Sequence, residues 1–156
     1  MSFATQLESF GVQTALQADD GQFWSYTELA HFADSLYGRD GQPHSGTLVA
    51  LECANRAINV AAYLGALRAS CPVLLLDSSL DAALKSELYR HYNIAWTMDA
   101  EGAWRHSGGS GPSTHPELAL LLSTSGSTGS AKLVKLSLTN LQTNAESISD
   151  YLGTQP

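Results

Sequence analysis

Positively charged residues are scarce in this sequence of 156 residues, where eight lysines and arginines stand against fifteen aspartates and glutamates. The formal net charge of -7 means that the chain as a whole repels polyanions, and it carries no basic stripe. Nucleic acid is therefore not expected as a partner. Any anion that the protein binds has to be held locally, by backbone N–H groups and one or two cationic side chains, because the overall field opposes it.

Cysteine and long apolar runs are also scarce. The two cysteines, Cys53 and Cys71, form neither a C-x-x-C pair nor a Cys/His cluster, which argues against a disulfide framework and against a structural zinc. No apolar run approaches the length that spans a bilayer, and the opening MSFATQLESF lacks the basic and apolar regions of a signal peptide. We therefore expect a soluble cytoplasmic protein without a membrane span.

Hydrophobic residues are abundant by comparison. They make up 44% of the chain and charged residues only 15%, the balance of a globular protein with a buried core rather than of a disordered chain. The length suffices for one domain but not for two ordinary ones. We predict a single domain over residues 1–156.

The apolar pattern predicts alternating strands and helices. The expected strands are 47–52, 72–77, 94–98 and 118–122, and the expected helices are 25–38, 55–70, 79–92 and 138–153. Continuous Val/Leu runs are typical of parallel strands that are covered on both faces. The predicted fold class is therefore α/β, with a mostly parallel sheet flanked by helices.

Two of the helices carry further signals. Ser25 is a good N-cap residue, and Glu28 three positions later completes a capping box. The last helix should end at Gly153 and bury one apolar stripe against the protein. That stripe consists of Leu141, Ala145, Ile148 and Leu152.

A loop built from Ser, Thr and Gly follows the strand at 118–122 and ends with Lys132. Gly126 and Gly129 allow the backbone to turn its N–H groups toward one point, the hydroxyls add donors, and the lysine adds charge, so the loop suits polyphosphate. A flexible surface linker has the same composition. Composition and context alone leave both alternatives open.

Two familiar phosphate motifs do not fit this loop. The P-loop requires two glycines separated by four residues with a lysine directly after the second, whereas Gly126 is followed by Gly129 and Lys132 comes later. The dinucleotide fingerprint G-x-G-x-x-G is not completed here, nor in the stretch 108–111, where Pro112 stands in place of a helix start.

The order of residues in TSGSTGSAK is more specific than its composition. It resembles the phosphate-binding signature of the adenylate-forming superfamily, [TS]-S-G-[ST]-T-G-x-P-K followed by G-V-x-x-[ST]-H-x-N-L. The matching positions are Thr124, Ser125, Gly126, Ser127, Thr128, Gly129, Lys132, Val134, Ser137, Asn140 and Leu141. Two upstream segments, WSYTELAHFADSL and YLGALRASCPVLLLD, are similar to early segments of that family in the same order. The resemblance thus covers nearly the whole chain.

The match has three departures. Ala131 replaces the usual proline, Leu133 the glycine after the lysine, and Leu138 the usual histidine. The alanine loosens the backbone slightly, and the two leucines remove a polar group near the site. These three departures affect the part of the family's site that binds the acyl group more than the part that binds the phosphates.

The resemblance implies an enzyme that activates a carboxylic acid with Mg·ATP, forms an acyl-adenylate and pyrophosphate, and passes the acyl group to the thiol of CoA or of a carrier protein. It also implies that the ATP phosphates are bound by Thr124, Ser125, Gly126, Ser127, Thr128, Gly129 and Lys132. The later motifs of the family, including its catalytic lysine, have no counterpart here. The chain therefore resembles only the N-terminal portion, to be completed by the remainder of a synthetase.

Three functions remain as hypotheses. The first is the N-terminal segment of an acid–thiol ligase of the acyl-CoA synthetase type, inactive alone. The second is part of an adenylation domain of the nonribosomal peptide synthetase type, and the third is a non-catalytic nucleotide-binding or interaction module. A partial domain should leave an apolar face uncovered and self-associate or bind a hydrophobic dye, whereas a finished module should not.

The other chemically interesting side chains are weaker candidates. The five histidines contain no metal-like pair, so no metal ligand is predicted. Asp77 ends a strand, where we favour a role in the turn over a role in a site. The three tryptophans are most simply core or rim residues.

Overall fold

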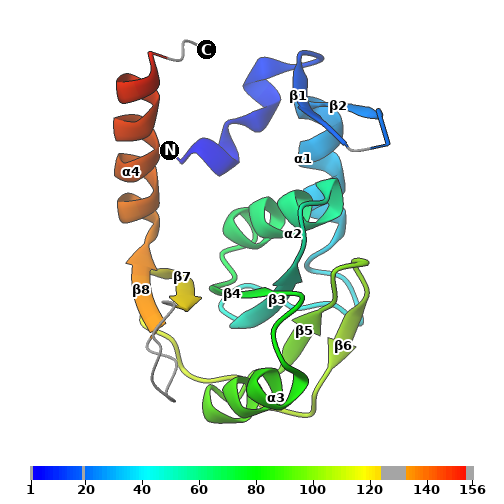
Figure 1. Cartoon of the computed structure of the whole chain (residues 1–156), viewed down its shortest axis with the longest axis vertical. Helices are drawn as coiled ribbons and strands as arrows, with labels where there is room; N and C mark the ends of the chain where they lie inside the picture. Colours follow the sequence, from blue (N-terminus) through cyan, green and yellow to red (C-terminus); the bar gives the residue numbers. More distant parts are fainter. Residues whose placement is uncertain (1, 19, 124–132, 154–156) are drawn as a thin grey trace.

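The computed structural model describes residues 2–18, 20–123 and 133–153. Its centre is a six-stranded sheet with the strand order β6-β5-β3-β4-β7-β8 (Figure 1). The strands are β3 (Val49–Cys53), β4 (Val73–Asp77), β5 (Trp96–Met98), β6 (Trp104–His106), β7 (Leu118–Ser123) and β8 (Leu133–Ser137). The four inner strands are parallel, and β6 and β8 are antiparallel strands at the two edges. The predicted α/β fold with a mostly parallel sheet is confirmed.

Helices cover both faces of this sheet. Helices α1 (Tyr26–Ser35) and α2 (Ala57–Arg68) lie on one side, and α3 (Ala82–His91) lies on the other. Because successive side chains of a strand point to opposite faces of the sheet, the core has one part on each side of the sheet. Val49 and Leu51 of β3 belong to the cluster with α2, whereas Ala50 and Leu74 pack with Leu88 of α3. The prediction of strands buried on both faces therefore holds for β3 and β4.

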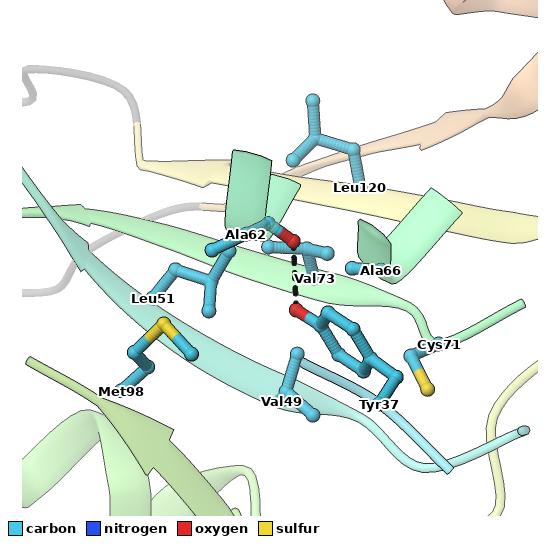
Figure 2. Close-up of a cluster of buried hydrophobic side chains, with 9 residues drawn as sticks. All are labelled: Tyr37, Val49, Leu51, Ala62, Ala66, Cys71, Val73, Met98 and Leu120. Atoms are coloured by element: carbon cyan, nitrogen blue, oxygen red, sulfur yellow. Dashed lines mark hydrogen bonds between the residues drawn. The ribbon is translucent and has the colours of Figure 1, made fainter. Parts of the chain in front are cut away.

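Figure 2 shows the core cluster beneath α2. Tyr37 follows α1 and is 5% exposed, and its hydroxyl donates a hydrogen bond of 2.7 Å to the carbonyl oxygen of Ala62 in α2. Burial raises the pKa of the Tyr37 hydroxyl, so it stays protonated at neutral pH and remains a donor. This bond fixes the segment after α1 against the middle of α2.

Helix α1 begins as the sequence predicts. The backbone N–H of Glu28 donates to the Ser25 side chain at 3.2 Å, and the Glu28 carboxylate accepts from the Ser25 backbone N–H at 2.9 Å. These two bonds satisfy groups that the first turn of a helix leaves unpaired. The Glu28 carboxylate also accepts a hydrogen bond from the Ser25 hydroxyl at 2.7 Å. The bonds that it accepts lower the pKa of the Glu28 carboxyl group, the one from the Ser25 backbone more than the one from the Ser25 side chain.

A two-stranded hairpin and two short 3-10 helices were not assigned from the sequence. The hairpin is formed by β1 (Thr14–Gln17) and β2 (Phe23–Ser25), and the 3-10 helices are η1 (Phe3–Thr5) and η2 (Leu7–Phe10). Arg68 at the end of α2 ties this N-terminal part to the helices. Its guanidinium group donates to Asp34 at 2.6 and 2.8 Å, to the Ala4 carbonyl oxygen at 2.8 Å, and to Glu8.

Helix α4 (Leu138–Leu152) corrects one prediction. It begins with Ser137 as N-cap and ends at Gly153, whose backbone is left-handed with φ of 63°, as expected. Its apolar stripe, however, is not buried. Leu141 is half-buried, but Ala145 is exposed, and Ile148 and Leu152 are 50% and 64% exposed. The physical reason is that, among the described residues, only the first part of α4 has neighbours to pack against, namely β7, β8 and the N-terminal segment (Figure 1).

The remaining expectations concern single residues and the membrane. The three tryptophans, Trp24, Trp96 and Trp104, are half-buried, as rim residues of the core should be. Residues 107–115 form neither helix nor strand. No helix within the described ranges combines the length and the apolar character that crossing a bilayer requires.

Candidate functional site

Three neighbouring parallel strands, β3, β4 and β7, end at the same edge of the sheet. Strand β3 continues into α2 on one face, and β4 continues into α3 on the other face. Adjacent strands whose connections leave on opposite faces create a crevice between their carboxyl ends, where open α/β sheets usually bind ligands. This carboxyl edge, formed by Cys53, Asp77 and Ser123 with the residues that follow each of them, is the candidate site.

The predicted phosphate loop connects the end of β7, which lies at this edge, to the start of β8. Its candidate residues, Thr124, Ser125, Gly126, Ser127, Thr128, Gly129 and Lys132, lie outside the described residues. The residues on either side are described: Ser123 at the end of β7 is paired with Leu133 at the start of β8 in an antiparallel ladder. The two ends of the loop are therefore held side by side, next to the carboxyl end of β4.

Two further residues of the family signature have a structural role here. Ser137 and Asn140 form a capping box at the start of α4, in which the Ser137 side chain accepts from the Asn140 backbone N–H at 3.1 Å. The Asn140 side-chain oxygen accepts in return from the Ser137 backbone N–H at 3.0 Å. Their match to the signature is thus explained by the helix start.

Asp77 is the last residue of β4 and is bonded to the turn that follows it. Its carboxylate accepts hydrogen bonds from the Ser79 side chain at 2.6 Å and from the Ser79 backbone N–H at 2.7 Å. These two bonds lower the pKa of the Asp77 carboxyl group, the side-chain bond most. The bonds favour the turn role that the sequence suggested.

A cluster of three titratable side chains at this edge was missed in the sequence. Lys85 of α3 donates to Glu52 of β3 at 2.6 Å and to the carbonyl oxygen of Ser78 at 2.7 Å, and the Tyr89 hydroxyl donates to Glu52 at 2.8 Å. Burial, followed by the contact with Glu52, raises the pKa of the Tyr89 hydroxyl. The cluster joins β3, α3 and the turn after β4. The sequence did contain a signal for this cluster. Glu52 follows an apolar run, and Lys85 and Tyr89 are spaced one helical turn apart, so they share one face of their helix.

Replacing Lys85 by methionine tests this cluster. The change leaves the Glu52 carboxylate, only 23% exposed, without its cation, and should lower the free energy of unfolding by about 2 kcal/mol. Urea denaturation of the wild-type and variant chains measures the difference. The matched control is Lys135→Met, at an exposed residue of β8, with an expected change within about 0.5 kcal/mol. Equal effects of the two changes would show that the cluster contributes nothing specific.

A pocket of about 690 Å³ opens beside the end of β3. We call it the hairpin pocket, because the β1–β2 hairpin forms one wall and the first turn of α2 another. Its apolar lining includes Leu16, Trp24, Cys53, Ile58, Tyr63 and Leu75. Burial raises the pKa of the Cys53 thiol, so this side chain is protonated at neutral pH and adds no charge to the pocket.

The site contains few groups that could hold a metal ion. Within the described ranges, no three His, Cys, Asp or Glu side chains come close enough together to form a metal site. Cys53 and Cys71 are free thiols.

Comparison with known proteins gives structural matches only. No family model and no curated protein sequence matches the chain. Among solved structures, apo MatB from Rhodopseudomonas palustris matches 100% of this chain and 39% of its own, with a TM-score of 0.75 and 18% identity. MenE from Bacillus subtilis, an O-succinylbenzoate coenzyme A synthetase solved with AMP, matches 97% of this chain and 46% of its own, with a TM-score of 0.78 and 19% identity.

A third match is the N-terminal subdomain of NpsA from Klebsiella oxytoca in complex with 3-hydroxybenzoyl-AMSN. It covers 87% of this chain and 41% of its own, with a TM-score of 0.67 and 20% identity. The chain thus spans less than half the length of each of these three matched chains. The likeness shows the fold, which the chain shares with part of MatB, part of MenE and part of the N-terminal subdomain of NpsA.

Proposed function

We propose that the chain is the N-terminal segment of an ATP-dependent acid–thiol ligase of the acyl-CoA synthetase type. The loop 124–132 would hold the ATP phosphates while a carboxylic acid is adenylated and pyrophosphate leaves. The observation that carries the proposal is the pairing of the two described residues on either side of this segment. Ser123 ends β7 and Leu133 begins β8 at the carboxyl edge of a sheet whose fold is shared with MatB and MenE.

The nucleotide complexes of these proteins support the choice of ligand. MatB has been solved with ATP, and MenE with AMP and with its acyl-adenylate intermediate OSB-AMP. In the proposed reaction a carboxylate oxygen attacks the α-phosphorus, the acyl-adenylate forms, and pyrophosphate departs. A thiol of CoA or of a carrier protein then takes the acyl group and releases AMP.

The chain's own contribution to this chemistry is positioning and charge. Backbone N–H groups at Gly126 and Gly129 and the hydroxyls of the Ser/Thr positions would bind the β- and γ-phosphate oxygens, with Lys132 opposing their charge. Mg²⁺ would reach the site bound to ATP and neutralise the same oxygens. The net charge of -7 makes such local neutralisation necessary.

The remainder of a longer synthetase chain would supply the adenine, ribose and acyl pockets. The short span of the match to MatB, MenE and NpsA supports this part of the proposal. So does α4, where Ile148, Tyr151 and Leu152 are at least half exposed. An uncovered apolar surface of this kind is expected for a partial domain, which favours the ligase over the finished interaction module. The nonribosomal adenylation domain remains the alternative, with no observation that favours it.

Binding of Mg·ATP to this chain tests the loop assignment. We expect weak binding by isothermal titration calorimetry, lost in Lys132→Ala because the phosphates lose their cation. Lys135→Ala is the matched control, since it removes the same charge three residues away, at an exposed residue of β8. Submillimolar binding that survives Lys132→Ala would overturn the phosphate cradle.

The size of the native polypeptide tests the ligase itself. An immunoblot of the source cells with antibodies against this domain should show a band several times heavier than the 156-residue chain. Acid-dependent exchange of pyrophosphate into ATP by that longer protein would then establish adenylation. A band at the size of this chain would instead require a separate partner to complete the site.

A further inference from the structure

We draw no further inference here: the strongest candidate, the hairpin pocket between the β1–β2 hairpin and the first turn of α2, is an open apolar groove, and nothing among the described residues shows what covers it.

Discussion

Replacing Gly65 by alanine is expected to lower the free energy of unfolding by about 3 kcal/mol, although alanine is the better helix former. Gly65 lies in the middle of α2, where it faces α1. A Cβ atom added there would be 2.4 Å from the carbonyl oxygen of Ala33 and 2.8 Å from the Tyr37 ring. The obstacle is the backbone of another helix, so a rotamer change cannot relieve it.

Two effects of opposite sign compete at Gly65. Helix propensity alone predicts a gain of up to about 1 kcal/mol for the alanine variant. The clash requires α1 and α2 to separate, which loosens the packing around the Tyr37 hydrogen bond to Ala62. Because interiors are close-packed, the second effect should dominate. Urea denaturation decides between them, and a Gly65→Ala variant as stable as the wild type would show that the helices separate freely.

Leu74→Ala should destabilise the chain by about 3–4 kcal/mol, in the middle of the range for buried leucines. Leu74 is fully buried in β4, one of the inner strands, in the cluster that includes Ala50, Leu88 and Leu121. Neighbouring strands on both sides hold its backbone in place. The surroundings therefore cannot collapse far into the cavity that the substitution creates.

Leu152→Ala is the matched control for Leu74. It removes the same atoms from a side chain that is 64% exposed near the end of α4, so the expected change is within about 0.5 kcal/mol. Thermal or urea unfolding of both variants provides the comparison. If the two leucines cost the same, either β4 is less tightly enclosed or α4 is more firmly packed than the structure indicates.

The sequence predicted the repeating elements of the fold because their signals are local. Ser25 and Glu28 specify a helix start through their own hydrogen bonds, and the Val/Leu runs of β3 and β4 specify strands without reference to their partners. The β1–β2 hairpin was missed because its strands have only four and three residues and are partly exposed, so neither carries a long apolar pattern.

Helix α4 shows what a local sequence pattern does not predict. Its period of apolar residues correctly predicts a helix, but a period alone does not say what covers the apolar side. Ile148 and Leu152 have the right spacing and still lie exposed, because among the described residues nothing packs against that part of the helix. Burial depends on neighbours that are distant in sequence, which a local pattern does not contain.

Some parts of the candidate site were likewise predicted from the sequence, and others were missed. The loop 124–132 was found because its order of residues matches a known signature within one short segment. The Glu52, Lys85 and Tyr89 cluster and the hairpin pocket each bring together side chains from several elements. Only the strand order, with β4 beside β3 and α3 on the far face, places them together.

The position of β3 in the sheet has a consequence for synthesis on the ribosome. Strand β3 is the first strand of the large sheet to be translated, and both of its neighbours, β4 and β5, follow it in the chain. Its two edges and both apolar faces therefore emerge before any partner strand exists. Parallel pairing across a helix is slow to form, so the nascent chain passes through an aggregation-prone stage that ends only when β5 has been made.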